Sequence, residues 1–221
     1  MFRGIFLLSS ILALILKVKK HLIYIAKKYY KRGAKMKREE LMGTYDAIFS
    51  LGDLCLTSIQ LKKHQLRPYS GVMDWVATPE LSKLNMLLRN RFDNLMKFEH
   101  LRIVGPAGPD MICVSDDYYH FVSNHDFGTD KNSLTHIGSY PEVMEKYNRR
   151  INRFLGKMRT AKRILFVRTE GSLEDVTELQ QVLRDLVKND FSILVINHEN
   201  VNGIVEKNWP LSNVYSVAFP N

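Results

Sequence analysis

Cysteine is scarce in this sequence, which contains only Cys55 and Cys113 among 221 residues. Two cysteines are too few for a disulfide-stabilised scaffold, so we expect a reducing compartment. Long apolar runs are also missing. The longest, residues 5–16, spans about twelve residues, whereas a membrane-spanning helix needs about 20. With 45% apolar residues and no internal repeat, the chain is long enough for one domain with a sizeable core.

Acidic residues are absent before Glu39, and this absence produces much of the formal net charge of +9. Eleven of the 32 lysines and arginines lie within residues 1–38, so the rest of the chain holds 21 basic residues beside all 23 acidic ones. The positive charge therefore belongs to an N-terminal arm. A nucleic-acid-binding domain would carry basic residues on its own surface, so we do not expect a nucleic-acid partner.

The arm joins the apolar run to a lysine-rich stretch, KVKKHLIYIAKKYYKR, with apolar and basic residues at roughly helical spacing. A secretory signal peptide fits poorly, because lysines follow the run where a small-residue cleavage site belongs. A short signal anchor would leave the lysines on the cytoplasmic side. A monotopic helix would lie in the membrane interface, with its lysines on anionic lipid. Initiation at Met36 or Met42 would remove the arm.

These patterns divide the chain in two. Residues 1–43 are predicted to be an apolar and basic membrane-associating helix with a linker from about residue 33, and residues 44–221 the domain. We expect residues 1–38 to contact the membrane surface and the domain to face the cytoplasm. If residues 1–35 are not made, the protein would be cytoplasmic.

Apolar runs and helical periodicity alternate along the domain. Near-continuous apolar runs predict buried strands, and a period near 3.6 predicts amphipathic helices. The predicted strands are 45–51, 101–104, 111–114, 118–122, 163–169, 191–197 and 214–218, with an extended piece at 72–76, and the predicted helices are 54–65, 79–90, 92–98, 141–160 and 175–188. Such alternation indicates an α/β layered domain with a substantially parallel sheet flanked by helices.

Cys55 lies three residues after Gly52, which ends the first predicted strand, and Asp53 is expected to cap the following helix. Cys55 then occupies about the second helical position, where free backbone N–H groups and the helix dipole favour a thiolate. The same amides could stabilise an oxyanion on an attacked substrate. Against a nucleophile, the Asp53 carboxylate would repel a thiolate, and free cysteines are most often small buried hydrophobes.

His125 follows a predicted strand, a place where loops commonly carry functional side chains. A neutral imidazole within reach of Cys55 would accept the thiol proton and later protonate a leaving group. The chain has seven histidines, so His125 could equally be an ordinary surface residue. The main other candidates for the base are His64, His120 and His136.

Asp74 lies within an otherwise apolar piece, Met73-Asp74-Trp75, so a buried carboxylate there must be paired or hydrogen-bonded. It could orient His125 as a third catalytic residue. It could equally cap a turn or pair with Arg67, and we prefer that structural interpretation.

No pattern predicts a metal or a cofactor. Asp116-Asp117 lacks further ligands at a convincing spacing. Gly52 and Gly171-Ser172 form neither a phosphate loop nor a dinucleotide fingerprint. A Gly-x-Ser-x-Gly elbow is also absent. The arginines of the predicted helix 141–160 are expected to form a solvated basic face.

Several separated segments carry a family resemblance. They are Phe49-Ser50-Leu51-Gly52-Asp53-Leu54-Cys55, Leu61, Leu66-Arg67, Ser70-Gly71-Val72-Met73-Asp74-Trp75, Asn90-Arg91-Phe92, His125-Asp126-Phe127, Tyr147-Asn148-Arg149-Arg150-Ile151-Asn152-Arg153-Phe154 and Leu165-Phe166-Val167-Arg168. In this order, over about residues 45–200, they resemble a bacterial family of unknown function described as papain-like cysteine peptidases. The resemblance implies Cys55 as nucleophile and His125 as base, an activity itself inferred by comparison with papain-like enzymes.

The sequence also departs from papain-like enzymes. Leu56 follows the cysteine where an aromatic residue is usual, and no glutamine shortly precedes it. The predicted strand, helix and strand over residues 163–197 read as a parallel unit, unlike the antiparallel half of a papain fold. These departures leave room for a different cysteine hydrolase or an acyltransferase on a doubly wound sheet.

We therefore expect a papain-like cysteine peptidase, or a related thiol hydrolase or acyltransferase, that acts through a covalent Cys55 intermediate without a cofactor. Its substrate would be an acyl, peptide or glycan-linked group. The alternative is a non-catalytic binding module in membrane-linked or cell-surface glycan assembly, in which Cys55 and His125 merely pack.

Overall fold

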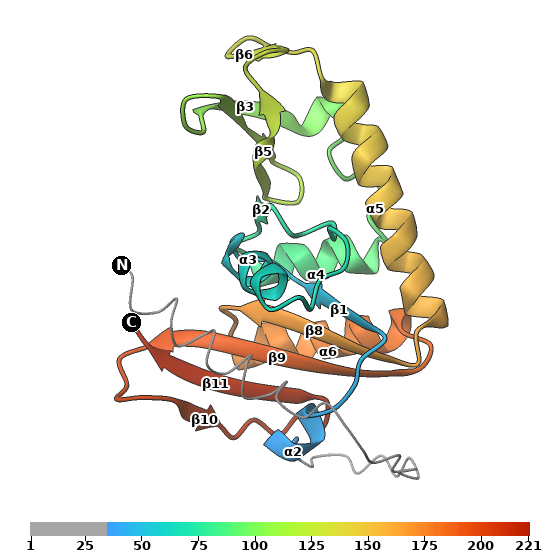
Figure 1. Ribbon diagram of the computed structural model, residues 1–221, viewed down its shortest axis with the longest axis vertical. Coiled ribbons are helices and arrows are strands. Elements are labelled where there is room, and N and C mark those ends of the chain that lie inside the picture. Colours follow the sequence, from blue (N-terminus) through green and yellow to red (C-terminus); the bar gives the residue numbers. More distant parts are fainter. Residues whose placement is uncertain (1–34) are drawn as a thin grey trace.

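Four near-continuous apolar segments form the parallel strands of the main sheet in the computed structural model, which describes residues 35–221 (Figure 1). Hydrogen bonds order this sheet, sheet A, as β1-β8-β9-β11-β10. Its strands are β1 (Ala47–Ser50), β8 (Arg163–Thr169), β9 (Asp190–Glu199), β10 (Val205–Lys207) and β11 (Val214–Pro220). All pairings are parallel except that of β10 with β11. The expected α/β domain with a substantially parallel sheet is confirmed.

Helices cover both faces of sheet A, and this double burial explains why its strands are apolar throughout. The helices are α2 (Arg38–Leu41), α3 (Leu56–Lys63), α4 (Leu81–Arg89), α5 (Tyr140–Thr160) and α6 (Leu173–Leu186). One face shares a core with α4, α5 and α6, and the other shares a second core with α2 and α3. Side chains alternate between these cores along β8, where Phe166 enters the first and Leu165 and Val167 the second.

Part of the predicted linker belongs to the domain core. Met36 and Leu41 are buried in the second core, and Met36 N donates a hydrogen bond of 3.3 Å to the carbonyl of Leu211. The predicted membrane-associating arm, residues 1–34, lies outside the described residues. Among the helices of residues 35–221, none combines the length and the hydrophobicity that a membrane crossing requires.

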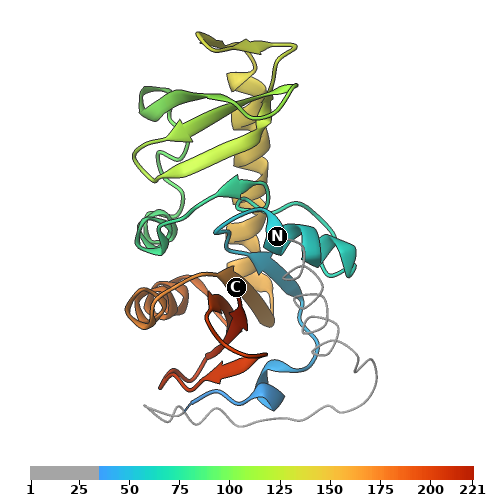
Figure 2. The same ribbon diagram turned by 90° about the vertical axis from the view of Figure 1, so that its left-hand side faces the viewer.

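A second sheet, sheet B, lies at the opposite end of the molecule, and α5 runs alongside both sheets (Figures 1 and 2). Sheet B is antiparallel with the order β2-β5-β4-β3. Its strands are β2 (Val76–Ala77), β3 (Leu101–Pro106), β4 (Met111–Asp116) and β5 (Phe121–Gly128). A short 3₁₀ helix, η1 (Phe98–His100), precedes β3, and a small hairpin of β6 (Asn132–Ser133) and β7 (His136–Ile137) precedes α5. The alternating pattern of the sequence had not indicated a separate antiparallel sheet.

Three local expectations are wrong. Helix α3 begins at Leu56 with Cys55 as its N-cap, and not at Leu54 with Asp53 as the cap. Residues 92–96 form turns instead of a helix, because left-handed backbone conformations at Phe92, Asn94 and Met96 interrupt helical geometry, and Phe98 already belongs to η1. Strand β5 continues to Gly128, so His125 lies within a strand and not in the loop after it.

Candidate active site

The loop after β1 turns sharply at the carboxyl edge of sheet A. Gly52 has a φ of +78°, and a Cβ atom there would overlap the hydroxyl of Thr78, so glycine is required. Asp53 has a φ of +32°, and its carbonyl accepts a hydrogen bond of 2.7 Å from Thr78 N. This turn places Cys55 at the start of α3.

Cys55 is a partly exposed free thiol at the N-cap of α3. Its carbonyl accepts the first helical hydrogen bond, 3.0 Å from Ile59 N, and its side chain makes no capping bond. The first turn of α3 contains no acidic residue. Because the first N–H groups of a helix have no intrahelical partner, the N-cap is a favourable place for a thiolate and for an oxyanion.

Asp53 was expected to cap the helix, but its carboxylate points toward an arginine and not toward these amides. Asp53 Oδ1 lies 3.9 Å from Nη2 of Arg168. Burial raises the pKa of the Asp53 carboxyl, and the positive charge of Arg168 opposes this rise. The negative charge two residues before Cys55 is therefore partly balanced by a buried cation.

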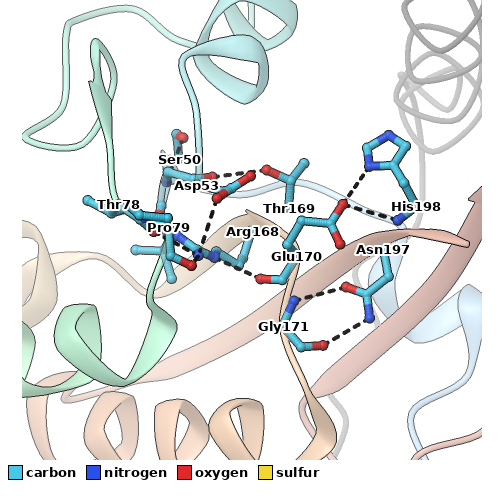
Figure 3. A network of polar contacts seen from close by, with 12 residues as sticks. Ser50, Asp53, Thr78, Pro79, Arg168, Thr169, Glu170, Gly171, Asn197 and His198 are labelled. Carbon is cyan, nitrogen blue, oxygen red and sulfur yellow. Dashed lines mark hydrogen bonds and ion pairs between the residues drawn. The ribbon is translucent and has the colours of Figure 1, made fainter. Parts of the chain in front are cut away.

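Arg168 is completely buried and joins three segments around the Cys55 loop (Figure 3). Its Nη1 donates to the carbonyl of Leu51 at 3.0 Å and to the hydroxyl of Thr78 at 2.9 Å. Its Nη2 donates to the Thr78 carbonyl and its Nε to the Glu170 carbonyl, both at 2.9 Å. Burial lowers the pKa of Arg168 to about 10, which leaves it positively charged at neutral pH. Arg168 thus fixes the end of β1 against the segments that follow β2 and β8.

Ser58 links the Cys55 turn to the segment that contains Asp74. Its buried hydroxyl lies 2.8 Å from the carbonyl of Cys55 and also reaches the carbonyl of Asp74. The Asp74 carboxylate is buried, accepts a hydrogen bond of 2.6 Å from Gly71 N and forms an ion pair with Arg67. The ion pair between Asp74 and Arg67, one of the alternatives expected from the sequence, is thus present.

His125 is exposed in β5, and its ring packs edge-on against Trp75 with centroids 5.8 Å apart and an interplanar angle of 75°. Trp75 also lies beneath the Arg67 guanidinium, 5.4 Å from the ring centroid. The strand bulges here. Between two registered pairs, β4 contributes only Cys113, whereas β5 contributes residues 124–126. Such bulges redirect side chains and occur frequently beside active sites.

Asp126 anchors this bulge. Its buried carboxylate accepts a hydrogen bond of 2.6 Å from Ser123 Oγ and also binds Lys146 and Tyr147 of α5. Burial alone would raise the pKa of the Asp126 carboxyl, but its hydrogen bonds to these three residues outweigh burial and lower the pKa. The anchor fixes the backbone that carries His125 and leaves the imidazole itself exposed.

Within the described part of the chain, Cys55 and His125 are linked only indirectly, through contacts to the segment Asp74-Trp75. Both border the segment Asp74-Trp75, Cys55 through Ser58 and His125 through the indole ring. No hydrogen bond within residues 35–221 links Cys55 to His125, or His125 to the Asp74 carboxylate. Asp74 lies in this segment, and Cys55 and His125 are linked to it. The catalytic roles of all three residues stay predictions.

The other candidate histidines lie elsewhere. His64 is the C-cap of α3, and His136 lies in β7. His120 precedes β5, and its Nδ1 lies 2.5 Å from Glu80.

Sequence reasoning missed a histidine that the structure places at the carboxyl edge of sheet A. His198 lies in the last part of β9, and its Nδ1 is 2.5 Å from Oε1 of Glu170, which follows β8 (Figure 3). The sequence did contain a signal for His198, because Asn197-His198-Glu199 lies at the end of an apolar strand, just as Cys55 follows the end of another. The carboxyl ends of parallel strands meet at one edge, where such sheets commonly bind ligands.

Two observations bear on metal binding. Among residues 35–221, no group of three or more histidine, cysteine, aspartate or glutamate side chains has a geometry that suits a metal ion. Asp116 and Asp117 are engaged with protein groups, the first with Met96 N at 2.7 Å and the second with Arg102 Nε at 2.6 Å.

Fold and site together define an α/β protein with a cysteine at the start of the helix that follows the first strand of a parallel sheet. The family model described as "Putative papain-like cysteine peptidase (DUF1796)" matches residues 46–201, and the chain belongs to this family. A relative from Acanthamoeba polyphaga mimivirus, described as an uncharacterized protein, is 27% identical over 168 residues, covering 67% of this chain and 75% of the viral protein. No solved structure matches the chain.

Proposed function

We propose that the protein is a cysteine peptidase, or a related thiol hydrolase or acyltransferase, with Cys55 as nucleophile and His125 as general base. The observation that carries this proposal is the partly exposed free thiol at the N-cap of α3. The loop before it is held by hydrogen bonds from Arg168 to Leu51 and Thr78 and from Thr78 N to the Asp53 carbonyl. The description of the family supports the same chemistry.

In the proposed reaction, His125 accepts the proton of the Cys55 thiol, and the thiolate sulfur attacks the carbonyl carbon of the substrate. The first-turn N–H groups of α3 stabilise the resulting oxyanion. Collapse breaks the bond to the leaving group, which takes a proton from His125, and leaves a thioester on Cys55. Water or another acceptor then cleaves this thioester.

The position of His125 suits a base that completes its contact when substrate binds. Its imidazole is exposed, while Asp126 holds the bulge behind it. Catalytic hydrogen bonds are often long in an unliganded enzyme and shorten in the complex. Trp75, which packs against the imidazole, is available as one wall of the substrate site.

The fold bears on the choice of substrate. Strands β8 and β9 are parallel and joined through α6, as expected from the sequence, which differs from the antiparallel half of a papain fold. The proposed substrate class is therefore not restricted to peptides and includes other acyl groups and glycan-linked groups. The lysine-rich residues 1–38 would hold the domain at the cytoplasmic face of a membrane.

Thiol labelling tests the proposal. We would follow alkylation of the full chain by iodoacetamide from pH 5 to pH 9 in the wild type and in Cys55→Ala, Cys113→Ala and His125→Ala. At pH 6 an ordinary thiol with a pKa of about 8.5 is almost fully protonated and reacts slowly. We expect Cys55 to react at least ~10-fold faster than that, and His125→Ala to remove most of the difference.

Cys113 provides the internal control. It is buried in β4, and burial raises the pKa of its thiol although Arg102 opposes the rise, so it should label slowly. If Cys55 labels no faster than an ordinary thiol in the folded protein, the catalytic proposal is wrong. The non-catalytic binding module would then become the leading hypothesis.

A further inference from the structure

The carboxyl edge of sheet A carries a second group of ionisable side chains beside the Cys55 loop (Figure 3). Glu170 Oε1 lies 2.5 Å from His198 Nδ1 and also accepts a hydrogen bond of 3.1 Å from His198 N. The side chains of His198 and Glu170 are 30% and 42% exposed, so solvent and small molecules can reach both. The pair is therefore accessible and also has a defined geometry.

The backbone around this pair is held in an unusual conformation. Glu170 has a φ of +56°, a left-handed conformation that is unfavourable for a residue with a Cβ atom. Several contacts impose it: Glu170 N donates to Ile196 O at 3.0 Å, and the Asn197 side chain bonds both Gly171 N and Gly171 O. Strain that its surroundings maintain is typical of functional sites.

The geometry determines what His198 can do. An imidazole that donates its Nδ1 proton to a carboxylate keeps an unprotonated Nε2, which can accept a proton from a bound molecule. Within residues 35–221, His198 Nε2 has no hydrogen-bond partner. The carboxylate also stabilises the imidazolium that forms on protonation. His198 and Glu170 therefore have the form of a general base with its positioning residue.

The pair and the nucleophile belong to neighbouring strand ends. Strand β8 lies between β1 and β9 in sheet A. The hydroxyl of Thr169, the residue before Glu170, donates to the Gly52 carbonyl at 3.3 Å. The charges of Glu170 and His198 also influence the pKa of Asp53, two residues before Cys55. Glu170 and His198 are therefore close enough to the loop before Cys55 for their charges to act on Asp53.

We propose that His198, positioned by Glu170, is the base that activates the acceptor in the second half of the reaction. This inference rests on the proposed function, because it requires the Cys55 thioester. His198 Nε2 removes a proton from an acceptor hydroxyl, amine or water as the acceptor attacks the thioester carbonyl carbon. The tetrahedral intermediate then breaks its C–S bond, Cys55 departs as thiolate, and the proton on His198 returns to the thiolate or to solvent.

The test separates formation of the acyl enzyme from its breakdown, with p-nitrophenyl acetate as the probe and intact-mass measurement of the protein. The wild type should release a burst of nitrophenolate, acquire an acetyl group on Cys55 and then lose it. His198→Ala should keep the burst and retain the acetyl group, with breakdown slowed about 10²-fold or more. Glu170→Gln should slow breakdown about 10-fold with an unchanged burst, an effect that a general loss of stability would not produce.

His120→Ala is the matched control, because His120 Nδ1 also lies 2.5 Å from a glutamate, Glu80, but lies outside sheet A. It should not slow breakdown. If acetyl–Cys55 decays as fast in His198→Ala and Glu170→Gln as in the wild type, this inference alone is overturned. A wild type that forms no acetyl–Cys55 would overturn the proposed function and this inference with it.

Discussion

The carboxyl edge of sheet A and the bulge of sheet B each present a partly or fully exposed histidine, but they hold it differently. At the edge, His198 is oriented by a hydrogen bond to Glu170. On the bulge, the His125 ring packs against Trp75, while the buried contacts belong to the neighbouring Asp126. The edge orients a side chain by a hydrogen bond, whereas the bulge fixes a backbone and holds the side chain only by ring packing. Different roles for the two histidines in the proposed reaction would follow from this difference.

The largest expected effect of a substitution is at Arg168, which holds the carboxyl edge of sheet A. Replacing it in Arg168→Met would leave the carbonyls of Leu51, Thr78 and Glu170 without their buried donor. We expect the free energy of unfolding, measured by urea denaturation, to fall by about 3–5 kcal/mol. The control is Arg102→Met, which removes an arginine from an exposed pair with Asp117 and should change stability little. Equal stability of Arg168→Met and the wild type would mean that other contacts hold the edge.

The bulge is the second place to test. Asp126→Asn should reduce the free energy of unfolding by about 2 kcal/mol at neutral pH, because it weakens the charge-assisted bonds to Lys146 and Tyr147. The Asp126 pKa is lowered in the folded protein, so its stabilising contribution is complete above the unfolded pKa of about 3.9. That contribution is lost as the pH falls through the lower folded pKa.

Urea denaturation from pH 2 to pH 7 checks this dependence. The stability difference between the wild type and Asp126→Asn should be constant above about pH 5 and shrink below about pH 4. A difference that grows toward acid pH would contradict the assigned direction. Asp117→Asn, at an exposed site, should show little difference at any pH.

The smallest expected effect is at Trp75. Trp75→Leu removes the ring that packs against His125 and should slow iodoacetamide labelling of Cys55 by a few-fold, since aromatic contacts contribute about 0.5–1.5 kcal/mol. Breakdown of acetyl–Cys55, which we assign to His198, should be unchanged. If Trp75→Leu instead slows breakdown and spares labelling, the roles assigned to the two histidines must be exchanged.

The parts of the fold with strong periodicity could be predicted from the sequence. The apolar run of residues 163–169 is strand β8, and the predicted helix 141–160 differs from α5 by one residue at its start. The start of α3 could not be predicted, because Asp53 resembles a helix cap but takes a left-handed conformation and faces Arg168. The bulge of β5 was also hidden, since it depends on the register with β4.

The candidate site was only partly predictable for the same reason. Cys55 stands out because a glycine turn and a helix surround it in sequence, which is local information. The partnership of His198 with Glu170 depends on β8 and β9 being neighbours and in register. Arg168 was noted as part of a family motif, yet its partners Leu51 and Thr78 are distant in sequence. Strand order, which the sequence does not specify, decides these contacts.

The order of the strands has a consequence for synthesis of the protein. Strand β1 is at the edge of sheet A, and its strand partner β8 emerges from the ribosome much later. Arg168 and Leu51, whose contact secures the end of β1, are 117 residues apart. Such long-range contacts form slowly, and only after the intervening chain exists. Under the proposed function, a nascent chain would therefore contain Cys55 long before the contacts that hold its loop, so the thiol would gain its enhanced reactivity only when folding is nearly complete.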